Sequence, residues 1–201
     1  MKRSLPFLAF AAIAAVLTIA PARAAAVMEL IPGGDVMFAT SDGIAYAMSW
    51  TFTADQADVD ISGFFGGSGD GRAYLMRNVG TGTTIASEIA SFDFTPSNPN
   101  GGSVSLFNNL ALVAGTYFLV IEGRSASELE WYVADDANFE GDIEFNAAYV
   151  AVRDPSYAPG SMFSSDDVGY AMTVTGNAVP EPASASLALA GAALLVMRRR
   201  R

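Results

Sequence analysis

The chain has 201 residues, of which 51% are hydrophobic and 16% charged, and it contains neither His nor Cys. These absences exclude disulfides, thiol nucleophiles, His-dependent catalytic triads and His-ligated zinc. The chain has 21 acidic and 11 basic residues, a formal net charge of −10. Since binding to a phosphate backbone needs clustered Lys and Arg, nucleic acid is excluded as a partner.

The first 24 residues have the three parts of a secretory signal peptide. They begin with a Lys-Arg pair and continue with an apolar run over residues 5–20. Ala22 and Ala24 then form an A-x-A cleavage motif, and residues 24–26 form a second choice. This pattern predicts export, and residues 1–24 are therefore left out of the predicted fold.

The segment between this leader and residue 179 is strongly acidic. Leaving out Glu181 reduces the 21 acids to 20, and leaving out Lys2, Arg3, Arg23 and the four C-terminal arginines reduces the 11 bases to 4. The remaining balance, near −16, disfavours binding to anionic membrane surfaces and is compatible with divalent cations or neutral, hydroxyl-rich surfaces. No Lys remains after processing, which also removes Ser-Lys dyads and Schiff-base chemistry.

Residues 27–178 predict one all-β domain, because short apolar runs alternate with turn residues. The clearest strand covers residues 46–53, where every second residue is large and apolar, as expected for a strand with one buried face. Further strands are predicted at residues 58–65, 72–79, 83–89, 92–94 and 103–107.

The second half of this domain continues the pattern. Residues 116–122 are apolar on both faces, which predicts a central strand that is covered on both sides. Three more strands are predicted at residues 129–133, 143–152 and 168–175. An acidic loop is expected at residues 135–142, and a long polar loop at residues 154–167.

Eight to ten such strands predict an antiparallel two-sheet sandwich, jelly-roll-like, flanked by the signal peptide and a C-terminal hydrophobic sorting helix. Residues 112–123 also resemble a strand of bacterial pre-peptidase C-terminal domains. That resemblance implies a β-sandwich accessory module of secreted proteins, not a catalytic one.

The acidic loop contains a possible calcium site. Asp136, Asn138 and Glu140 offer oxygen ligands at alternate positions before a glycine, as in the first half of an EF-hand loop, and Asp142 follows. Ala147 stands where such a loop has its final bidentate Glu, so other loops would have to contribute ligands. The alternative is a solvated acidic loop without a ligand.

Catalysis and glycan binding are two further hypotheses for the domain. Paired carboxylates are the acid/base groups that remain for a secreted hydrolase, but the sequence selects no two of them, so the chain is predicted not to be an enzyme. Exposed aromatic rings could stack on sugars in a carbohydrate-binding module. Trp50 and Trp131 are predicted to lie in the core, whereas Tyr132 and Tyr157 are predicted to be exposed.

Residues 179–201 form a tail with three parts: a Pro-Glu-Pro triplet, an apolar run ending at Met197, and four arginines. The prolines end the last strand of the domain. The apolar run is shorter than the roughly 20 residues of a comfortable bilayer span, and the arginines are expected on the cytoplasmic side. The residues that carry the pattern are Pro180, Glu181, Pro182, Arg198, Arg199, Arg200 and Arg201.

This arrangement resembles the PEP-CTERM sorting signal of Gram-negative bacteria. The resemblance implies transient insertion in the inner membrane, removal of the tail by the membrane protease exosortase, and export to the cell surface or beyond. It also implies association with extracellular polysaccharide. An ordinary C-terminal anchor helix that stays in place is the alternative.

Overall fold

The computed structural model describes residues 25–40, 44–79, 85–124, 128–152, 163–164 and 169–179. Residues 24–178 form one compact unit. The leader, the Pro-Glu-Pro triplet, the apolar run and the four arginines lie outside the described residues.

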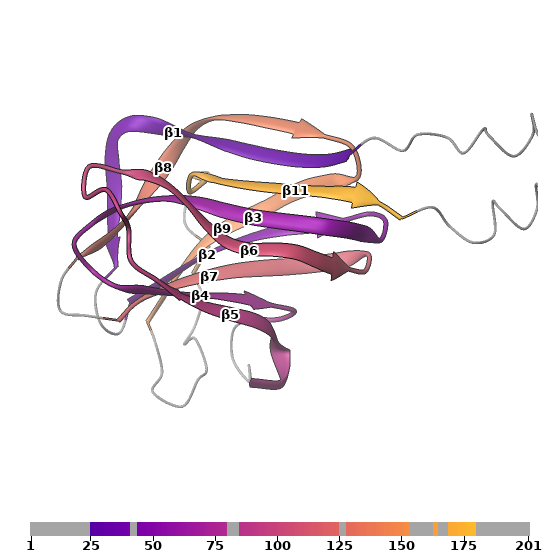
Figure 1. Ribbon diagram of the computed structural model, residues 1–201, viewed down its shortest axis with the longest axis horizontal. Coiled ribbons are helices and arrows are strands. Elements are labelled where there is room, and N and C mark those ends of the chain that lie inside the picture. The colour runs from indigo at the N-terminus through magenta and orange to yellow at the C-terminus, as the bar shows by residue number, and fades with distance from the viewer. Residues whose placement is uncertain are drawn as a thin grey trace, which may run out of the picture. The chain divides into compact units, whose positions relative to one another are not determined.

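The described residues are mostly in β-strands, with one 3-10 turn at Ile85–Ser87 (Figure 1). The strands are β1 (Ala25–Thr40), β2 (Ile44–Phe52), β3 (Gln56–Gly67), β4 (Gly71–Met76), β5 (Glu88–Phe94), β6 (Gly102–Leu112), β7 (Gly115–Gly123), β8 (Leu129–Glu140), β9 (Ile143–Val152), β10 (Phe163–Ser164) and β11 (Met172–Ala178).

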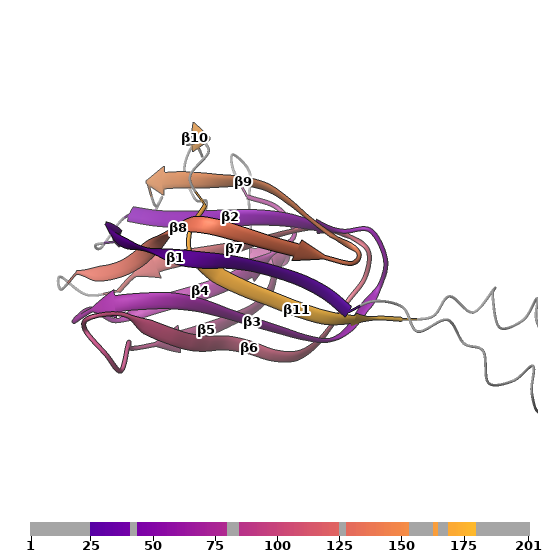
Figure 2. The same cartoon turned by 90° about the horizontal axis from the view of Figure 1, so that it is seen from above.

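These strands make two antiparallel sheets, which face each other as the layers of a sandwich (Figure 2). The five-stranded sheet has the order β11-β1-β8-β3-β6, and the six-stranded sheet has the order β10-β9-β2-β7-β4-β5. Strand β11 also pairs with β3 and therefore lies between β1 and β3, whereas β8 pairs with β3 only through residues 129–131. The first eight strands pair as a nested series, β1 with β8, β2 with β7, β3 with β6 and β4 with β5. Successive pairs alternate between the sheets, which is the winding of a jelly roll. The predicted fold class is confirmed.

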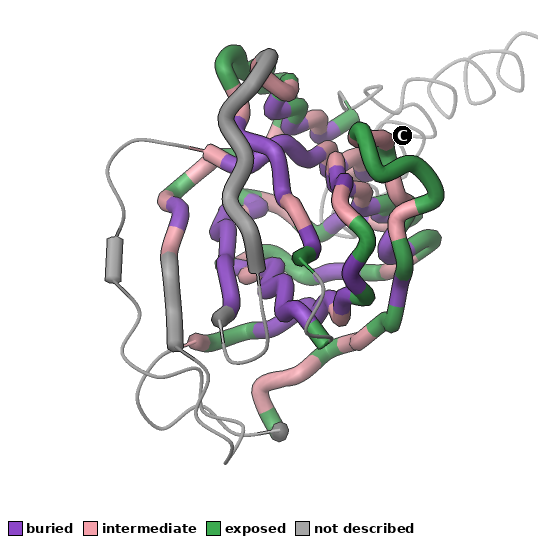
Figure 3. The backbone as a smooth tube through the Cα atoms, turned by 90° about the vertical axis from the view of Figure 1, so that its left-hand side faces the viewer, coloured by how far each residue is buried: buried purple, intermediate pink, exposed green. Residues whose placement is uncertain are grey.

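The core lies between the two sheets, and Figure 3 marks its buried residues in purple along the strands. It is rich in aromatic side chains. Trp131 stacks on Tyr170 with ring centroids 4.8 Å apart, and Trp50 stacks on Tyr117 at 6.1 Å. All four side chains are almost completely buried, and burial of one large apolar side chain contributes about 1.5–3 kcal/mol. This core holds the domain together without disulfides.

Strand β7 lies between β2 and β4 in the middle of the six-stranded sheet. Tyr117, Leu119 and Ile121 point into the core, whereas Phe118 and Val120 belong to a second apolar cluster on the outer face. The prediction of a central strand covered on both faces is confirmed.

Strand β1 was not predicted, because its Pro32-Gly33-Gly34 stretch has the composition of a turn. In the structure the β1–β8 ladder continues past it, with register shifts on both sides of Pro32. A Cβ atom on Gly33 would lie 2.1 Å from Cγ of Asp135, so a larger residue does not fit there unless Asp135 moves. The stretch is therefore a bulge inside a long strand.

Other expected boundaries are wrong. The acidic loop at residues 135–142 is a strand up to Glu140, and only the turn at residues 141–142 remains of it. The two strands expected at residues 83–89 and 92–94 are one strand, β5, preceded by the 3-10 turn. The last strand is β11, which ends at Ala178 rather than at residue 175. Most of the loop expected at residues 154–167 lies outside the described residues.

Candidate functional site

The two chain ends of the domain lie at the same end of the five-stranded sheet, here called the proximal end. Ala25, the first residue of β1, is in register with Asn177 of β11, and Ala26 is in register with Gly176. Figures 1 and 2 both show the start of β1 beside the end of β11. Anything attached to either end of the domain therefore emerges at the proximal end.

The last strand of the sandwich ends two residues before Pro180, the first residue of the predicted sorting motif. Ala178 still pairs with Gln56 of β3, which also pairs with Leu112 of β6. Val179 follows with 40% of its surface exposed, and Pro180 comes next. Hence the sandwich leaves almost no linker between its last strand and the Pro-Glu-Pro triplet.

Turns around the proximal end are fixed by hydrogen bonds. The backbone N–H of Thr53 donates to the carbonyl of Asp142 at 3.1 Å, and that of Ala114 donates to Oδ1 of Asp55 at 2.8 Å. Gly141 has a φ of 74°, and a Cβ atom there would lie 2.5 Å from the carbonyl oxygen of Ala25. The turn after β8 is thus packed directly against the start of the chain.

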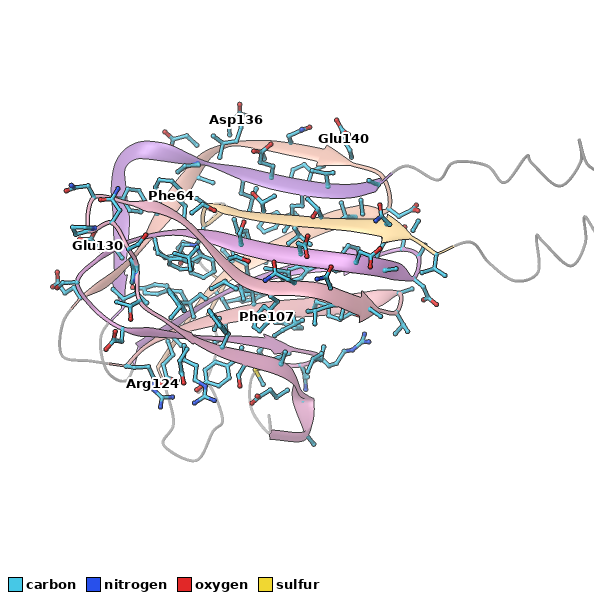
Figure 4. All side chains as sticks on the ribbon, in the orientation of Figure 1. Phe64, Phe107, Arg124, Glu130, Asp136 and Glu140 are labelled. Atoms are coloured by element: carbon cyan, nitrogen blue, oxygen red, sulfur yellow. The ribbon has the colours of Figure 1, made fainter. Side chains whose placement is uncertain are left out.

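The residues of the predicted calcium site lie at this end, but not in a loop. Asp136, Asn138 and Glu140 occupy alternate positions of β8, opposite β1, and neighbours on one face of an extended strand are separated by about 6.6 Å. Figure 4 shows Asp136 and Glu140 projecting outward from the edge of the sheet. Asp142 lies in the following turn, where Oδ1 accepts a hydrogen bond from the hydroxyl of Thr53 at 3.3 Å.

The EF-hand-like loop that suggested the calcium site is therefore absent from β8. Among the residues that the structure describes, no group of three or more acidic side chains is arranged to hold a metal ion. Calcium binding by Asp136, Asn138, Glu140 and Asp142 stays a prediction.

The aromatic candidates for glycan stacking are mostly internal. Trp50 and Trp131 lie in the core, as predicted, and Nε1 of Trp131 donates to the carbonyl of Ala171 at 3.0 Å. Tyr132 was predicted to be exposed, which is wrong: it is only 8% exposed, and its ring packs edge-on against Phe64 at 5.0 Å. Tyr157 lies outside the described residues.

A polar cluster on the outer face of the six-stranded sheet was not predicted. Glu122 of β7 is only 3% exposed, and its Oε2 accepts a hydrogen bond from the hydroxyl of Tyr74 at 2.7 Å. Arg72 lies beside them, with its guanidinium 5.4 Å from the ring centroid of Tyr74, and forms an ion pair with Asp93 at 3.6 Å. Strand register aligns Arg72 with Glu122 on one side and with Asp93 on the other.

The electrostatics of this cluster indicate a structural role, not a catalytic one. Burial raises the pKa of Tyr74 to about 12, and the hydrogen bond to Glu122 and the charge of Glu122 act in the same direction. At neutral pH the phenol is therefore protonated and donates a hydrogen bond instead of acting as a base. The only hint in the sequence was a Glu at the end of an apolar strand.

Beside this polar cluster, the same outer face carries a group of mostly apolar side chains. The rings of Phe118 and Tyr149 lie 6.1 Å apart, on strands on either side of β2. Between them β2 presents the small residues Ala47 and Ser49, both almost completely buried, and the Ser49 hydroxyl lies 3.2 Å from that of Tyr149. Together these side chains form a small second core on the sheet.

Within the part of the chain that the structure describes, no helix has the length and apolar character needed to cross a membrane.

Comparison with known proteins identifies the tail. The family model of the PEP-CTERM protein-sorting motif matches residues 178–201. No curated protein matches the chain. The chain therefore carries a PEP-CTERM motif, as its Pro-Glu-Pro triplet, apolar run and arginines predicted, and the resemblance to pre-peptidase domains stays a prediction. The motif indicates an exported protein that an exosortase processes and that is sorted to the cell surface.

Proposed function

We propose that this protein is a non-enzymatic component of the cell surface or extracellular matrix, and that it associates with exopolysaccharide there after its tail is removed. In this proposal the precursor is inserted in the inner membrane through residues 183–197 until an exosortase cuts it. The leader is removed at Ala24, and the mature product is the β-sandwich.

One observation carries the proposal: the sorting motif begins where the sandwich ends. Strand β11 stops at Ala178, and the matched motif covers residues 178–201. Removing the tail beyond Val179 therefore takes away none of the described strands, and the product keeps both sheets of the jelly roll.

The chemistry of the domain supports a role without catalysis. Residues 27–179 contain no Lys, His or Cys, which removes His-dependent triads, thiol nucleophiles, Ser-Lys dyads and Schiff-base chemistry and leaves carboxylates as the acid/base groups. Glu122, the most buried carboxylate of the described residues, accepts a hydrogen bond from Tyr74. A charge near −16 favours contact with neutral, hydroxyl-rich polymers over contact with anionic membranes.

The first test measures the intact mass of the protein recovered from native cells, separated into membrane, surface and medium fractions. We expect a species that lacks the leader and the tail, located at the surface or in the medium. As a control, a variant with Pro180, Glu181 and Pro182 all replaced by Ala should keep its tail and stay in the membrane. A wild-type species that still ends at Arg201 and stays in the inner membrane would contradict the proposal.

The second test addresses the matrix. Exopolysaccharide extracted from the same cells is mixed with the purified sandwich, residues 25–179, and co-sedimentation is measured. We expect retention by this polymer and little retention by dextran of matched length. Equal retention by both polymers, or by neither, would contradict association with the polysaccharide.

A further inference from the structure

Strand β11 ends the domain and is nevertheless an internal strand of its sheet. Residues 172–175 pair with β1 on one side and with β3 on the other. Asn177 faces Ala25 and Ala57 in the same way, and Ala178 faces Gln56. Every residue of β11 thus takes part in at least one ladder.

The side chains of β11 and the residues before it fix the strand further. Met172 and Val174 point into the core and are almost completely buried. The carbonyl of Ala171 accepts hydrogen bonds from Nε1 of Trp131 at 3.0 Å and from the backbone N–H of Phe64 at 3.0 Å. Consequently β11 cannot leave the sheet without disrupting both neighbouring ladders and the core.

A protease needs several residues of its substrate in an accessible, extended form, and the backbone of a fully paired strand offers none until it unfolds locally. Residues 172–175 and 177 are paired on both sides, residues 176 and 178 are paired on one side, and Val179 is 40% exposed. Val179 is the one residue between β11 and Pro180. A protease that binds the folded protein therefore finds almost no accessible backbone upstream of the triplet.

We propose that folding of β11 sets the upstream limit of C-terminal processing. The mature chain ends at or beyond Val179, and the exosortase recognises residues from Val179 onward and none inside the sandwich. This inference rests on the proposed function, since it locates the cut that the proposed function requires.

The test in cells determines the C-terminal residue of the processed protein from its intact mass. The wild type should end at or beyond Val179. A variant with Gly-Ser-Gly-Ser inserted between Ala178 and Val179 should be cut at the same bond relative to Pro180, so that its mass rises by that of the insert. A wild-type end upstream of Val179, or a cut that moves by four residues relative to Pro180, would overturn the inference.

A second pair of variants tests the role of folding. Val174→Asp places a charge in the core and should yield shorter, ragged ends within residues 172–178. Asn177→Asp changes an exposed residue of the same strand and should give the wild-type end. If Val174→Asp also gives the wild-type end, β11 does not set the limit.

A third experiment is independent of the exosortase, so that failure of the proposed function can be told apart from failure of this inference. The purified full chain is digested with subtilisin, a protease of broad specificity, and the masses of the products are measured by mass spectrometry. We expect trimming of the tail to stop at or beyond Val179 while the sandwich stays intact. A product that stays folded but has lost part of residues 172–178 would overturn the inference, whatever the result in cells.

Discussion

Two strand segments flank the first half of β1, and only one of them is buried. Met28 of β1 pairs with Val174 of β11 on one side and with Phe139 of β8 on the other. The side chain of Val174 is completely buried, whereas that of Phe139 is 43% exposed. Two residues that share one partner thus have opposite environments.

The difference arises from what lies beyond each segment. Strand β11 has β3 as a second neighbour, and its inner face packs in the core. Residues 135–140 of β8 are exposed on both faces and, among the described strands, lie beside β1 alone, so they form the edge of the sheet at the proximal end (Figure 1). Pairing alone therefore does not bury a strand; a second neighbour and a facing sheet are also needed. The acidic residues on this edge oppose pairing with other chains.

The largest effect is expected when the same charge is placed on the two sides of Met28. Val174→Asp buries a carboxylate without a partner and should lower the free energy of unfolding by more than about 3 kcal/mol. Phe139→Asp adds a charge to an exposed edge and should change it by less than about 0.5 kcal/mol. Urea unfolding of both variants checks the comparison. Equal losses of unfolding free energy would show that the two segments do not differ in burial.

The same contrast explains which elements the sequence predicts. Strand β7 is predictable because apolar residues occupy both of its faces, which indicates a strand that is buried on both sides. The outer half of β8 is not, because acidic residues on an exposed edge have the composition of a loop. Strand β1 is hidden by Pro32-Gly33-Gly34, since a bulge and a turn use the same residues.

The candidate sites differ in the same way. The sorting motif is contiguous, so its residue types and order suffice to identify it. The contact between Tyr74 and Glu122 joins residues that are 48 positions apart and depends on the register of β4 and β7, which no local pattern reveals. The exposure predicted for Tyr132 is wrong because Phe64, on another strand, covers its ring.

The turn at the end of β8 sharpens the comparison, because an exposed segment can still have one constrained position. In Gly141→Ala the new methyl group meets the carbonyl oxygen of Ala25 at 2.5 Å, at a φ of 74°. We expect a loss of about 2 kcal/mol. Gly102→Ala is the control, since the nearest atom to its Cβ is 3.8 Å away and no positive φ is involved. Similar thermal stabilities of the two variants would contradict the constraint.

Burial of Tyr74 on the outer face of the six-stranded sheet should affect how stability depends on pH. The pKa of Tyr74 is about 12 in the folded protein, compared with 10.0 for a tyrosine that is free in water. The folded state therefore holds its proton to higher pH than the unfolded state does. This contribution to stability is complete below pH 10 and is lost as the pH rises through 12.

Tyr74→Phe removes that titration and also the hydrogen bond to Glu122. We expect a loss of about 1–2 kcal/mol at neutral pH and a shallower decline of stability between pH 10 and 12, measured by urea unfolding at each pH. A decline as steep as that of the wild type would mean that Tyr74 does not carry the shift.

The start of β1 tests how much the pairing with β11 contributes when little side-chain surface is involved. A chain that begins at Val27, as cleavage at the second motif would produce, lacks Ala25 and Ala26 and their register with Asn177 and Gly176. Because Ala26 is completely buried, we expect a loss of about 1 kcal/mol relative to a chain that begins at Ala25. Equal melting temperatures would show that the mature chain tolerates either leader cut.

The smallest effect on stability is expected at the acidic edge itself. Asp136→Asn combined with Glu140→Gln neutralises two solvated side chains on β8 and should change the free energy of unfolding by less than about 0.5 kcal/mol. Any rise in melting temperature caused by calcium should disappear in this double variant, and an unchanged rise would place the ion elsewhere.

Self-association should respond more strongly, because the edge of β8 loses the charges that oppose pairing with a second chain. The matched control removes the same charge through Glu29→Gln and Asp58→Asn, on β1 and β3, each of which has neighbours on both sides. In sedimentation velocity over a range of concentrations, we expect the edge variant to associate and the control to stay monomeric. Association of both variants would mean that the net charge of the protein, and not the position of the charges on the β8 edge, prevents self-association.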